Sequence, residues 1–305
     1  MGKEVCLLIL FNHRYDKNID RLDAVYCRRF SNRYYLVPFY NGDKDNVIPV
    51  YECSYQFQGY LAQGFDKFYN QKYKHYIIVA DDMIIDPVID ENNYKEYFKL
   101  ETYSGYITYW QPLSQWDGGF ERVENALEAH RLHKGVNSDE ELPTVQEAFE
   151  KAKEKNFDSF KFSRKLAFNG GIKRSLKYWT SSRSRVHLLG RIILGITLKL
   201  EYPFVYGYSD IFVISGEAIK EFCRICGVFA AMRLHVETAV PTAMMLTEKR
   251  VAVNEELGYK AHVMWRLEER EIVGSKYHWK VSELVNDWEE NVVCIHPIKL
   301  SQWKD

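Results

Sequence analysis

The chain has 305 residues, of which 46% are apolar and 27% are charged, as in ordinary soluble globular proteins. That length allows one large α/β domain or two modest ones. The net charge is −1, which excludes a global field that would attract nucleic acid or another polyanion. The longest apolar stretch, "LLGRIILGITLKL", is shorter than the roughly 20 residues of a membrane span and carries two cations. Because the first residues also predict a strand rather than a signal peptide, we expect a cytoplasmic protein.

The first part of the chain predicts alternating strands and helices. Val5 to Phe11 is a continuous apolar run, typical of a strand covered on both faces. "YYLVPFYNG" predicts a second strand and "YIIVA" a third. Apolar residues recur at helical spacing before each of these two strands: Ile19, Leu22, Tyr26 and Phe30, then Phe57, Tyr60, Leu61, Phe65 and Phe68. The β-α-β-α-β order predicts a parallel sheet, in which ligands bind beyond the carboxyl ends of the strands.

The middle of the chain changes character. "GYITYW" predicts a fourth strand, and "FERVENALEAHRLHK" a helix. Thr144 and Glu147 form a capping-box pattern at the start of another helix. Residues 139–158 hold seven acidic and three basic side chains, whereas residues 161–191 hold nine basic side chains and no acidic one. This shift indicates an inserted helical region, 117–200, with a partly basic surface.

The α/β pattern returns in the last third. Asp210 to Ile214 predicts a strand and Gly216 to Cys226 a helix, while "RVAVNEE" and "VVCIHP" predict short late strands. We therefore expect an α/β fold with a mostly parallel central sheet flanked by helices. Residues 1–116 would form one half of a single domain and residues 201–305 the other half.

Two adjacent aspartates, Asp81 and Asp82, directly follow the strand "YIIVA". Two carboxylates at one strand end repel each other and would raise each other's pKa. A divalent cation reverses that penalty, and carboxylate oxygens are the hard ligands that Mg²⁺ and Mn²⁺ prefer. A strand-end turn is the alternative interpretation, because aspartate is common in turns. The position after a buried α/β strand favours a metal site that would hold a nucleoside diphosphate.

The stretch "VADDM" resembles the metal-binding motif of GT-A glycosyltransferases, an Asp-any-Asp pattern after a hydrophobic strand. Ala80 stands in the first acidic position, which is a departure from that pattern. The resemblance implies a GT-A type fold and a hexosyltransferase-like enzyme that uses a UDP- or GDP-sugar with Mn²⁺ or Mg²⁺. It also implies that Asp82 binds the metal and that Asp81 contacts the donor. The acceptor would be a glycan or a lipid-linked sugar in surface polysaccharide or glycan synthesis.

Further site residues follow from the same resemblance. His296, after the strand "VVCI", corresponds to a C-terminal metal-binding histidine, and Lys299 to a lysine that faces the diphosphate. Asp210 in "GYSD" would accept hydrogen bonds from sugar hydroxyls. Asn12 and Arg14 follow the first strand, where the nucleotide base would lie, and an amide can hydrogen-bond a base edge. Glu237 is either a catalytic base that takes the acceptor proton or a residue that caps or salt-bridges a helix.

Several interpretations stay open. The basic segment 161–191 is a solvated face, a site for a phosphorylated acceptor, or a peripheral contact with an anionic membrane, where each cation near the surface adds roughly 1 kcal/mol. Trp110 and Trp116 stack on a sugar or pack in the core. A nucleotidyltransferase or a Rossmann dehydrogenase is disfavoured because no glycine-rich loop follows the first strand. The alternative to an enzyme is a non-catalytic carbohydrate- or nucleotide-binding protein that retains the fold.

Overall fold

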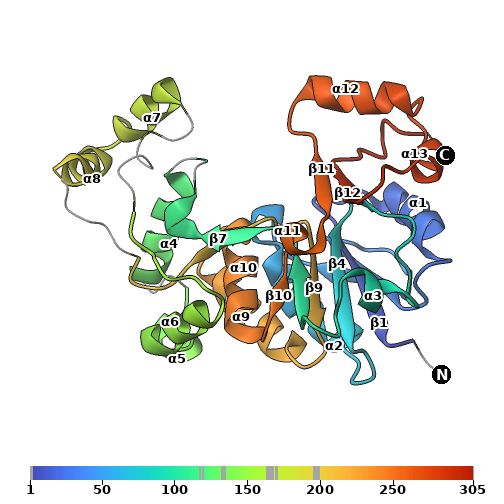
Figure 1. Cartoon of the computed structure of the whole chain (residues 1–305), viewed down its shortest axis with the longest axis horizontal. Coiled ribbons are helices and arrows are strands. Elements are labelled where there is room, and N and C mark those ends of the chain that lie inside the picture. Colours follow the sequence, from blue (N-terminus) through green and yellow to red (C-terminus); the bar gives the residue numbers. More distant parts are fainter. Residues whose placement is uncertain are drawn as a thin grey trace.

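The computed structural model has an α/β fold with a mostly parallel central sheet (Figure 1). It describes residues 3–116, 118, 120–131, 135–162, 168, 171–194 and 200–304. Parts of the predicted helix at 120–134 and of the basic segment 161–191 lie outside these residues, namely residues 132–134, 163–167, 169 and 170.

The central sheet has seven strands in the order β10-β6-β9-β4-β1-β2-β3. β1, β2, β3 and β4 run parallel, and β9 runs antiparallel to both β4 and β6. The strands of this sheet are β1 Val5–Leu10, β2 Arg33–Pro38, β3 Val47–Val50, β4 His75–Ala80, β6 Gly105–Ile107, β9 Ile211–Ser215 and β10 Val251–Ala252. Two smaller sheets contain β5 Ile84–Ile85, β11 Lys260–Val263 and β12 Val292–His296, and β7 Trp110–Pro112 with β8 Val205–Gly207.

Helices cover both faces of the central sheet. On one face, odd-numbered side chains of β1 pack with α1 and the C-terminal segment, while even-numbered side chains pack on the other face with α2, α9 and α10. Every residue of β1 and β4 is buried, which explains their unbroken apolar sequences. The helices are α1 Asp16–Tyr26, α2 Gln58–Phe68, α3 Tyr94–Tyr97, α9 Ile219–Ala231, α10 Val236–Thr247, α11 Asn254–Leu257, α12 Leu267–Lys276 and α13 Val281–Asn286, with a 3₁₀ turn η1 Ser54–Gln56.

The segment between β7 and β8 is mainly helical, as its sequence predicts, and lies beside the sheet (Figure 1). It contains η2 Leu113–Gln115, α4 Glu121–Arg131, α5 Ser138–Glu141, α6 Val145–Glu154, α7 Ile172–Trp179 and α8 Arg183–Ile193. The capping box at the start of α6 is confirmed, because the Thr144 hydroxyl accepts a hydrogen bond from the Glu147 backbone N–H and the Glu147 carboxylate reaches back to Thr144. Within the described residues, no helix is both long and apolar enough to cross a membrane.

Some predicted elements need correction. "YIIVA" lies in the fourth strand of the chain and not the third, since β3 precedes it. The sequence pattern does not predict β3, because that strand is only four residues long and contains Pro49. "GYITYW" forms two strands, β6 and β7, which belong to different sheets. The predicted helix at 216–226 starts later and continues to Ala231. Trp110 packs edge-on against Phe157 beside the core, as the packing interpretation expects.

Candidate functional site

Asp81 and Asp82 lie at the carboxyl end of β4, next to the end of β1. The backbone N–H of Asp81 donates to the carbonyl of Leu10 at 2.9 Å, which continues the β1–β4 pairing by one residue. The Asp81 carboxylate turns inward and accepts a hydrogen bond from the backbone N–H of Asn12 at 2.9 Å. Asp81 is only 3% exposed, whereas the side chain of Asp82 is 24% exposed. The two carboxylates therefore share one strand end but differ in their access to solvent.

Asp82 contacts a residue 214 positions further along the chain. Its Oδ1 lies 3.1 Å from Nε2 of His296, the last residue of β12, and 3.3 Å from the amide nitrogen of Asn12. The backbone supports this contact, since Ile298 donates its N–H to the carbonyl of Asp82 at 2.5 Å. Among the described residues, Oδ2 of Asp82 has no hydrogen-bond partner. This oxygen is thus available to a ligand.

The GYSD motif supplies the other side of His296. The hydroxyl of Tyr208 lies 2.7 Å from Nδ1 of His296, and Oδ2 of Asp210 lies 3.9 Å from the same nitrogen. Asp210 directly precedes β9, the antiparallel neighbour of β4, so the start of β9 meets the end of β4. Asp210 is the predicted site residue of this motif, but Tyr208 is the residue that contacts the histidine directly.

The cluster concentrates negative charge. Burial and the neighbouring charge of Asp82 raise the pKa of Asp81 far above its ordinary value. Burial, together with the charges of Asp82 and Glu237, raises the pKa of Asp210 to about 6. Burial opposes a charge on His296, but its contacts with Asp82 and Asp210 outweigh that effect and raise its pKa. Carboxylates that resist ionisation in this way are stabilised by any added positive charge.

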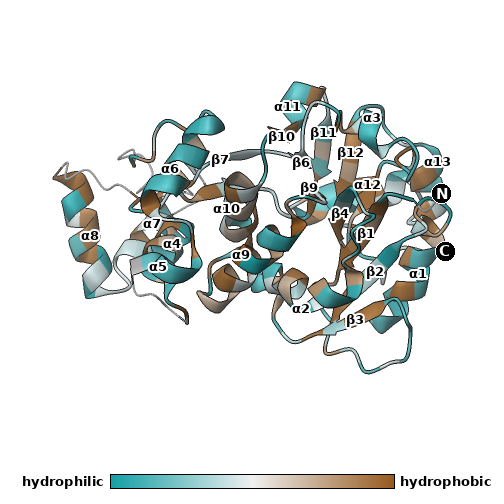
Figure 2. Ribbon diagram, turned by 90° about the horizontal axis from the view of Figure 1, so that it is seen from below, coloured by the Kyte–Doolittle hydropathy of each residue, from teal (hydrophilic) through white to brown (hydrophobic). Residues whose placement is uncertain are grey.

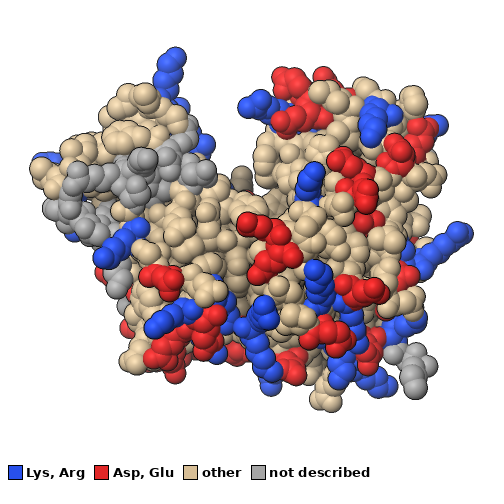
Figure 3. Space-filling view, viewed as in Figure 1, with Lys and Arg blue, Asp and Glu red and all other residues tan. Residues whose placement is uncertain are grey.

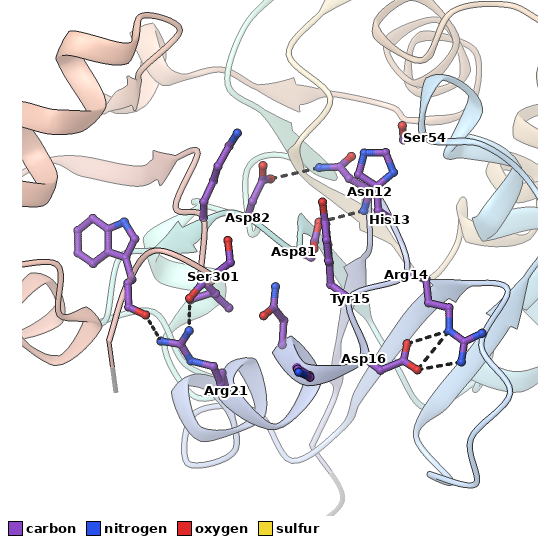
Figure 4. Close-up of a pocket in the computed structure, with 15 residues that line it drawn as sticks. Asn12, His13, Arg14, Tyr15, Asp16, Arg21, Ser54, Asp81, Asp82 and Ser301 are labelled. Carbon is purple, nitrogen blue, oxygen red and sulfur yellow. Dashed lines mark hydrogen bonds and ion pairs between the residues drawn. The ribbon is translucent and has the colours of Figure 1, made fainter.

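A cavity of about 890 Å³ opens beside the aspartates (Figure 4). Its wall brings together five of the residues predicted for the site: Asn12, Arg14, Asp81, Asp82 and Lys299. Figure 4 shows Asn12 bridging the two aspartates, with α1 on the opposite wall.

Two arginines shape the far wall of this cavity. Arg14 is held by Asp16 at 3.1 Å and by the side-chain oxygen of Asn41, so it points along the rim. Arg21 donates to the backbone carbonyls of Leu300 and Trp303, which fixes the C-terminal segment against α1. No sequence pattern indicates Arg21, because its partners are backbone atoms about 280 residues away.

A second cavity, of about 450 Å³, lies on the other side of Tyr208. Aromatic side chains dominate its wall, together with two acidic and two basic residues: Tyr109, Trp116, Tyr206, Tyr208, Trp265, Glu121, Arg122, Arg174 and Glu237. Trp116 stacks on Tyr206 with ring centroids 3.8 Å apart, and its buried indole nitrogen has no hydrogen-bond partner among the residues that the structure describes. Trp265 is 66% exposed, and its ring meets His296 edge-on at 5.8 Å. We call this space the aromatic cavity and the first one the carboxylate cavity.

Glu237 belongs to the aromatic cavity, not to the carboxylate cavity. It lies in the first turn of α10, and its carboxylate is 3.4 Å from the guanidinium of Arg122 on α4. Burial raises the pKa of Glu237, and the charge of Arg122 counteracts part of that rise. The N-cap of α10 is the neighbouring His235, whose Nδ1 accepts from the backbone N–H of Glu237. Glu237 therefore forms an ion pair, as the salt-bridge interpretation expects. It also faces a cavity, as a catalytic base must.

The carboxylate cluster suits a divalent cation in its chemistry. Carboxylate oxygens with one imidazole nitrogen form a donor set that fits Mn²⁺ better than Mg²⁺. Among the described residues, however, no three His, Cys, Asp or Glu side chains are arranged as a ready ligand group. Asp82 and His296 instead bond each other, so a metal would have to replace that hydrogen bond and take further oxygens from a ligand. Asp82 Oδ2 is the accessible donor atom.

Sequence comparisons identify no relative for this chain. No protein-family model matches it, and a search of curated proteins finds no significant match. The geometry of the two cavities must therefore support any functional assignment.

Proposed function

We propose that the protein is a metal-dependent glycosyltransferase of GT-A type that transfers a sugar from a nucleoside diphosphate to a hydroxyl acceptor. One observation carries the proposal: Asp82, at the end of a buried parallel strand, lies 3.1 Å from His296 beside a cavity large enough for a nucleotide. A carboxylate and an imidazole from distant parts of the chain are typical partners of a divalent cation. The surplus of carboxylates around them supports the same assignment.

Five residues in or next to the carboxylate cavity have roles in this proposal. Asp82 and His296 would hold the metal, which supplies positive charge to the leaving diphosphate when it is bound. Asn12 positions both aspartates through its backbone N–H and its amide. Asp81 accepts from the donor or holds Asn12 in place. Lys299 is exposed on the cavity wall and would add a second cation beside the diphosphate.

The aromatic cavity supplies the acceptor side. Tyr208 lines it and also contacts His296, the partner of Asp82, so the aromatic cavity lies next to the proposed metal ligands. Glu237 would take the proton from the acceptor hydroxyl while that oxygen bonds to the anomeric carbon and the bond to the diphosphate oxygen breaks. Arg122 favours the ionised form that a base needs. Aromatic rings on this wall offer flat apolar surfaces to a pyranose acceptor.

The first test is donor binding measured by calorimetry with UDP- and GDP-sugars, with and without Mn²⁺. We expect metal-dependent binding by the natural chain and at least about a 100-fold loss of affinity in Asp82→Ala, since changes even to the outer shell of metal sites cost 10–100-fold. Asp66→Ala removes an exposed carboxylate on α2, outside both cavities, and is the matched control. Equal affinity in Asp82→Ala would contradict the proposal.

The same experiment separates an enzyme from a non-catalytic binding protein. Ala80 replaces an acidic residue of the resembled motif, and this replacement favours the binding-protein alternative. An enzyme should release the nucleoside diphosphate slowly from its donor, even without an acceptor. Tight metal-dependent binding with no hydrolysis and no transfer to any glycan acceptor would instead identify a binding protein.

A further inference from the structure

Helices α7 and α8 form a basic surface with exposed apolar side chains. We call residues 171–194 the helical arm; it contains six Lys or Arg residues and no Asp or Glu. Large apolar side chains on the arm are exposed to solvent, including Leu194 at 79%, Ile172 at 71% and Ile193 at 58%, together with Leu176 and Val186. The arm lies at one end of the molecule, remote from the N- and C-termini (Figure 1), and Figure 2 shows apolar and polar turns alternating along α8.

One face of the arm is fixed to α4. The Tyr178 hydroxyl donates to Glu124 at 2.8 Å, and Arg185 forms an ion pair with the same carboxylate at 2.6 Å. Trp179 is buried next to Phe120, with ring centroids 4.9 Å apart. These contacts define the inner face of the arm, so residues on the opposite side of each helix point away from the protein.

The outer face mixes cations with apolar side chains. On α7, Ile172, Lys173, Leu176 and Lys177 are exposed at positions one helical turn apart, opposite the buried Ser175, Tyr178 and Trp179. On α8, Arg183, His187 and Arg191 form an exposed stripe beside Val186, Ile193 and Leu194. Lys173, Lys177, Arg183 and Arg191 have no acidic partner among the described residues. Figure 3 shows Lys and Arg side chains projecting from this end of the molecule.

We propose that the helical arm docks on an anionic lipid surface. Its charge is complementary to such a surface, and its exposed Ile, Leu and Val side chains are of the kind that enter the boundary between headgroups and acyl chains. Nucleic acid fits less well, because single strands need aromatic stacking platforms and the exposed apolar residues of the arm are aliphatic. Arg174 of α7 also lines the aromatic cavity. Resting on the proposed function, docking therefore places the acceptor side of the enzyme at the membrane and makes a lipid-linked sugar the acceptor.

Vesicle sedimentation of the full chain tests the proposal. We expect the protein to sediment with vesicles of phosphatidylcholine and phosphatidylglycerol at low salt and to dissociate from them as the salt concentration rises. It should not bind vesicles of pure phosphatidylcholine. The double variant Lys173→Ser with Lys177→Ser should lower vesicle affinity about 25-fold, at roughly fivefold for each of the two cations. The double variant Ile193→Ser with Leu194→Ser should weaken binding at every salt concentration.

Two control variants match these changes elsewhere on the surface. Lys67→Ser with Lys220→Ser removes two exposed cations from α2 and α9, and Leu267→Ser with Ile272→Ser removes two exposed apolar side chains from α12. Both controls should bind vesicles like the natural chain. The proposal is wrong if no vesicle binding occurs at low salt, or if the controls weaken binding as much as the arm variants. It is also wrong if the arm variants abolish self-association or RNA binding but leave vesicle binding intact.

Donor binding in vesicle-free solution distinguishes the two proposals. The arm variants should bind a nucleotide sugar with unchanged affinity, because none of their residues lines either cavity. Vesicle binding that fails while donor binding persists would overturn the membrane proposal alone. Vesicle binding that persists in a chain without nucleotide-sugar affinity would overturn the proposed function and leave the docking surface standing.

Discussion

The two cavities differ in how their charges are balanced. In the aromatic cavity each carboxylate has a cation, since Glu237 pairs with Arg122 and Glu121 with Arg174, both at 3.4 Å. At the edge of the carboxylate cavity, the carboxylates of Asp82 and Asp210 lie 3.1 and 3.9 Å from His296, and Asp81 is buried next to Asp82. Paired charges with aromatic walls suit an uncharged sugar, whereas carboxylates gathered around one histidine suit a cation. This difference supports the proposal that one cavity binds the metal and the donor and the other binds the acceptor. Variants of either cavity can test it.

The largest effect is expected from Glu237→Gln in the aromatic cavity. This change keeps the shape of the side chain but removes the proposed base, and general base catalysis contributes about 10²–10⁴-fold to rate. The turnover number for transfer should fall by that factor, while calorimetry should show unchanged donor affinity. Glu121→Gln, which alters the other carboxylate of the same cavity, is the control and should retain most activity. A transfer rate that is unchanged in Glu237→Gln would reduce Glu237 to the partner of an ion pair.

Next to the carboxylate cavity, Asp210→Asn should separate stability from function. The pKa of Asp210 is about 6 in the folded protein against an ordinary 3.8, so the folded state loses stability as pH rises between these values. Asparagine does not ionise, and the variant without metal should gain about 1–3 kcal/mol in free energy of unfolding at neutral pH. Urea denaturation with a chelator present measures this gain.

The same variant should bind a donor more weakly in Mn²⁺. Asp210 lies beside the proposed ligand His296, and such neighbours of metal ligands contribute about 10–100-fold to metal affinity. Asp139→Asn, an exposed residue on α5, should change neither quantity. If Asp210→Asn were less stable than the natural chain and equally active, the Asp210 carboxylate would serve the stability of the fold and not the binding of metal.

The sequence and the family resemblance predicted Asp82 and His296 as ligands of one metal, but they did not predict how the chain brings the two side chains together. The buried run of β4 correctly predicted that Asp81 and Asp82 lie at a strand end, because unbroken apolar residues define both the strand and its limit. His296 was predicted from its place after a strand, yet its 3.1 Å contact with Asp82 depends on how two sheets meet. No spacing in the chain encodes that junction.

Three other residues of the aromatic cavity were not among the predicted site residues. Arg122 sits in the helical region whose sequence resembled nothing known, and only the fold brings it to Glu237. Tyr208 stands inside the GYSD motif, and its signal was available two residues before Asp210. Trp265 comes shortly after β11. This strand has no apolar run in its sequence that would predict it, because none of its four side chains is fully buried. The tertiary fold, rather than any local sequence pattern, therefore brings these three residues together around the aromatic cavity.

A smaller effect is expected on the pH dependence of transfer. Arg122 lowers the pKa of Glu237 against the effect of burial, so Arg122→Gln should raise that pKa. Because a base must be ionised, the acidic limb of the pH–rate profile should move to higher pH, with the largest loss of rate at the acid end. Arg174→Gln removes the other arginine of the same cavity and should leave the limb in place. A shift of the limb to lower pH in Arg122→Gln would contradict the assignment of Glu237 as the base.

The smallest effect concerns Trp265, which lines the aromatic cavity next to His296. Its ring is exposed over the aromatic cavity and edge-on to His296, so one face is free to stack on an acceptor sugar. Such stacking is worth about 0.5–1.5 kcal/mol, and Trp265→Ala should raise the KM for the acceptor about 2- to 10-fold without altering donor affinity. Trp265→Phe should restore most of the loss, and Tyr51→Ala, which removes an equally exposed ring outside both cavities, should have no effect. If Trp265→Ala weakened donor binding instead, Trp265 would belong to the donor site, and the acceptor would have to bind elsewhere.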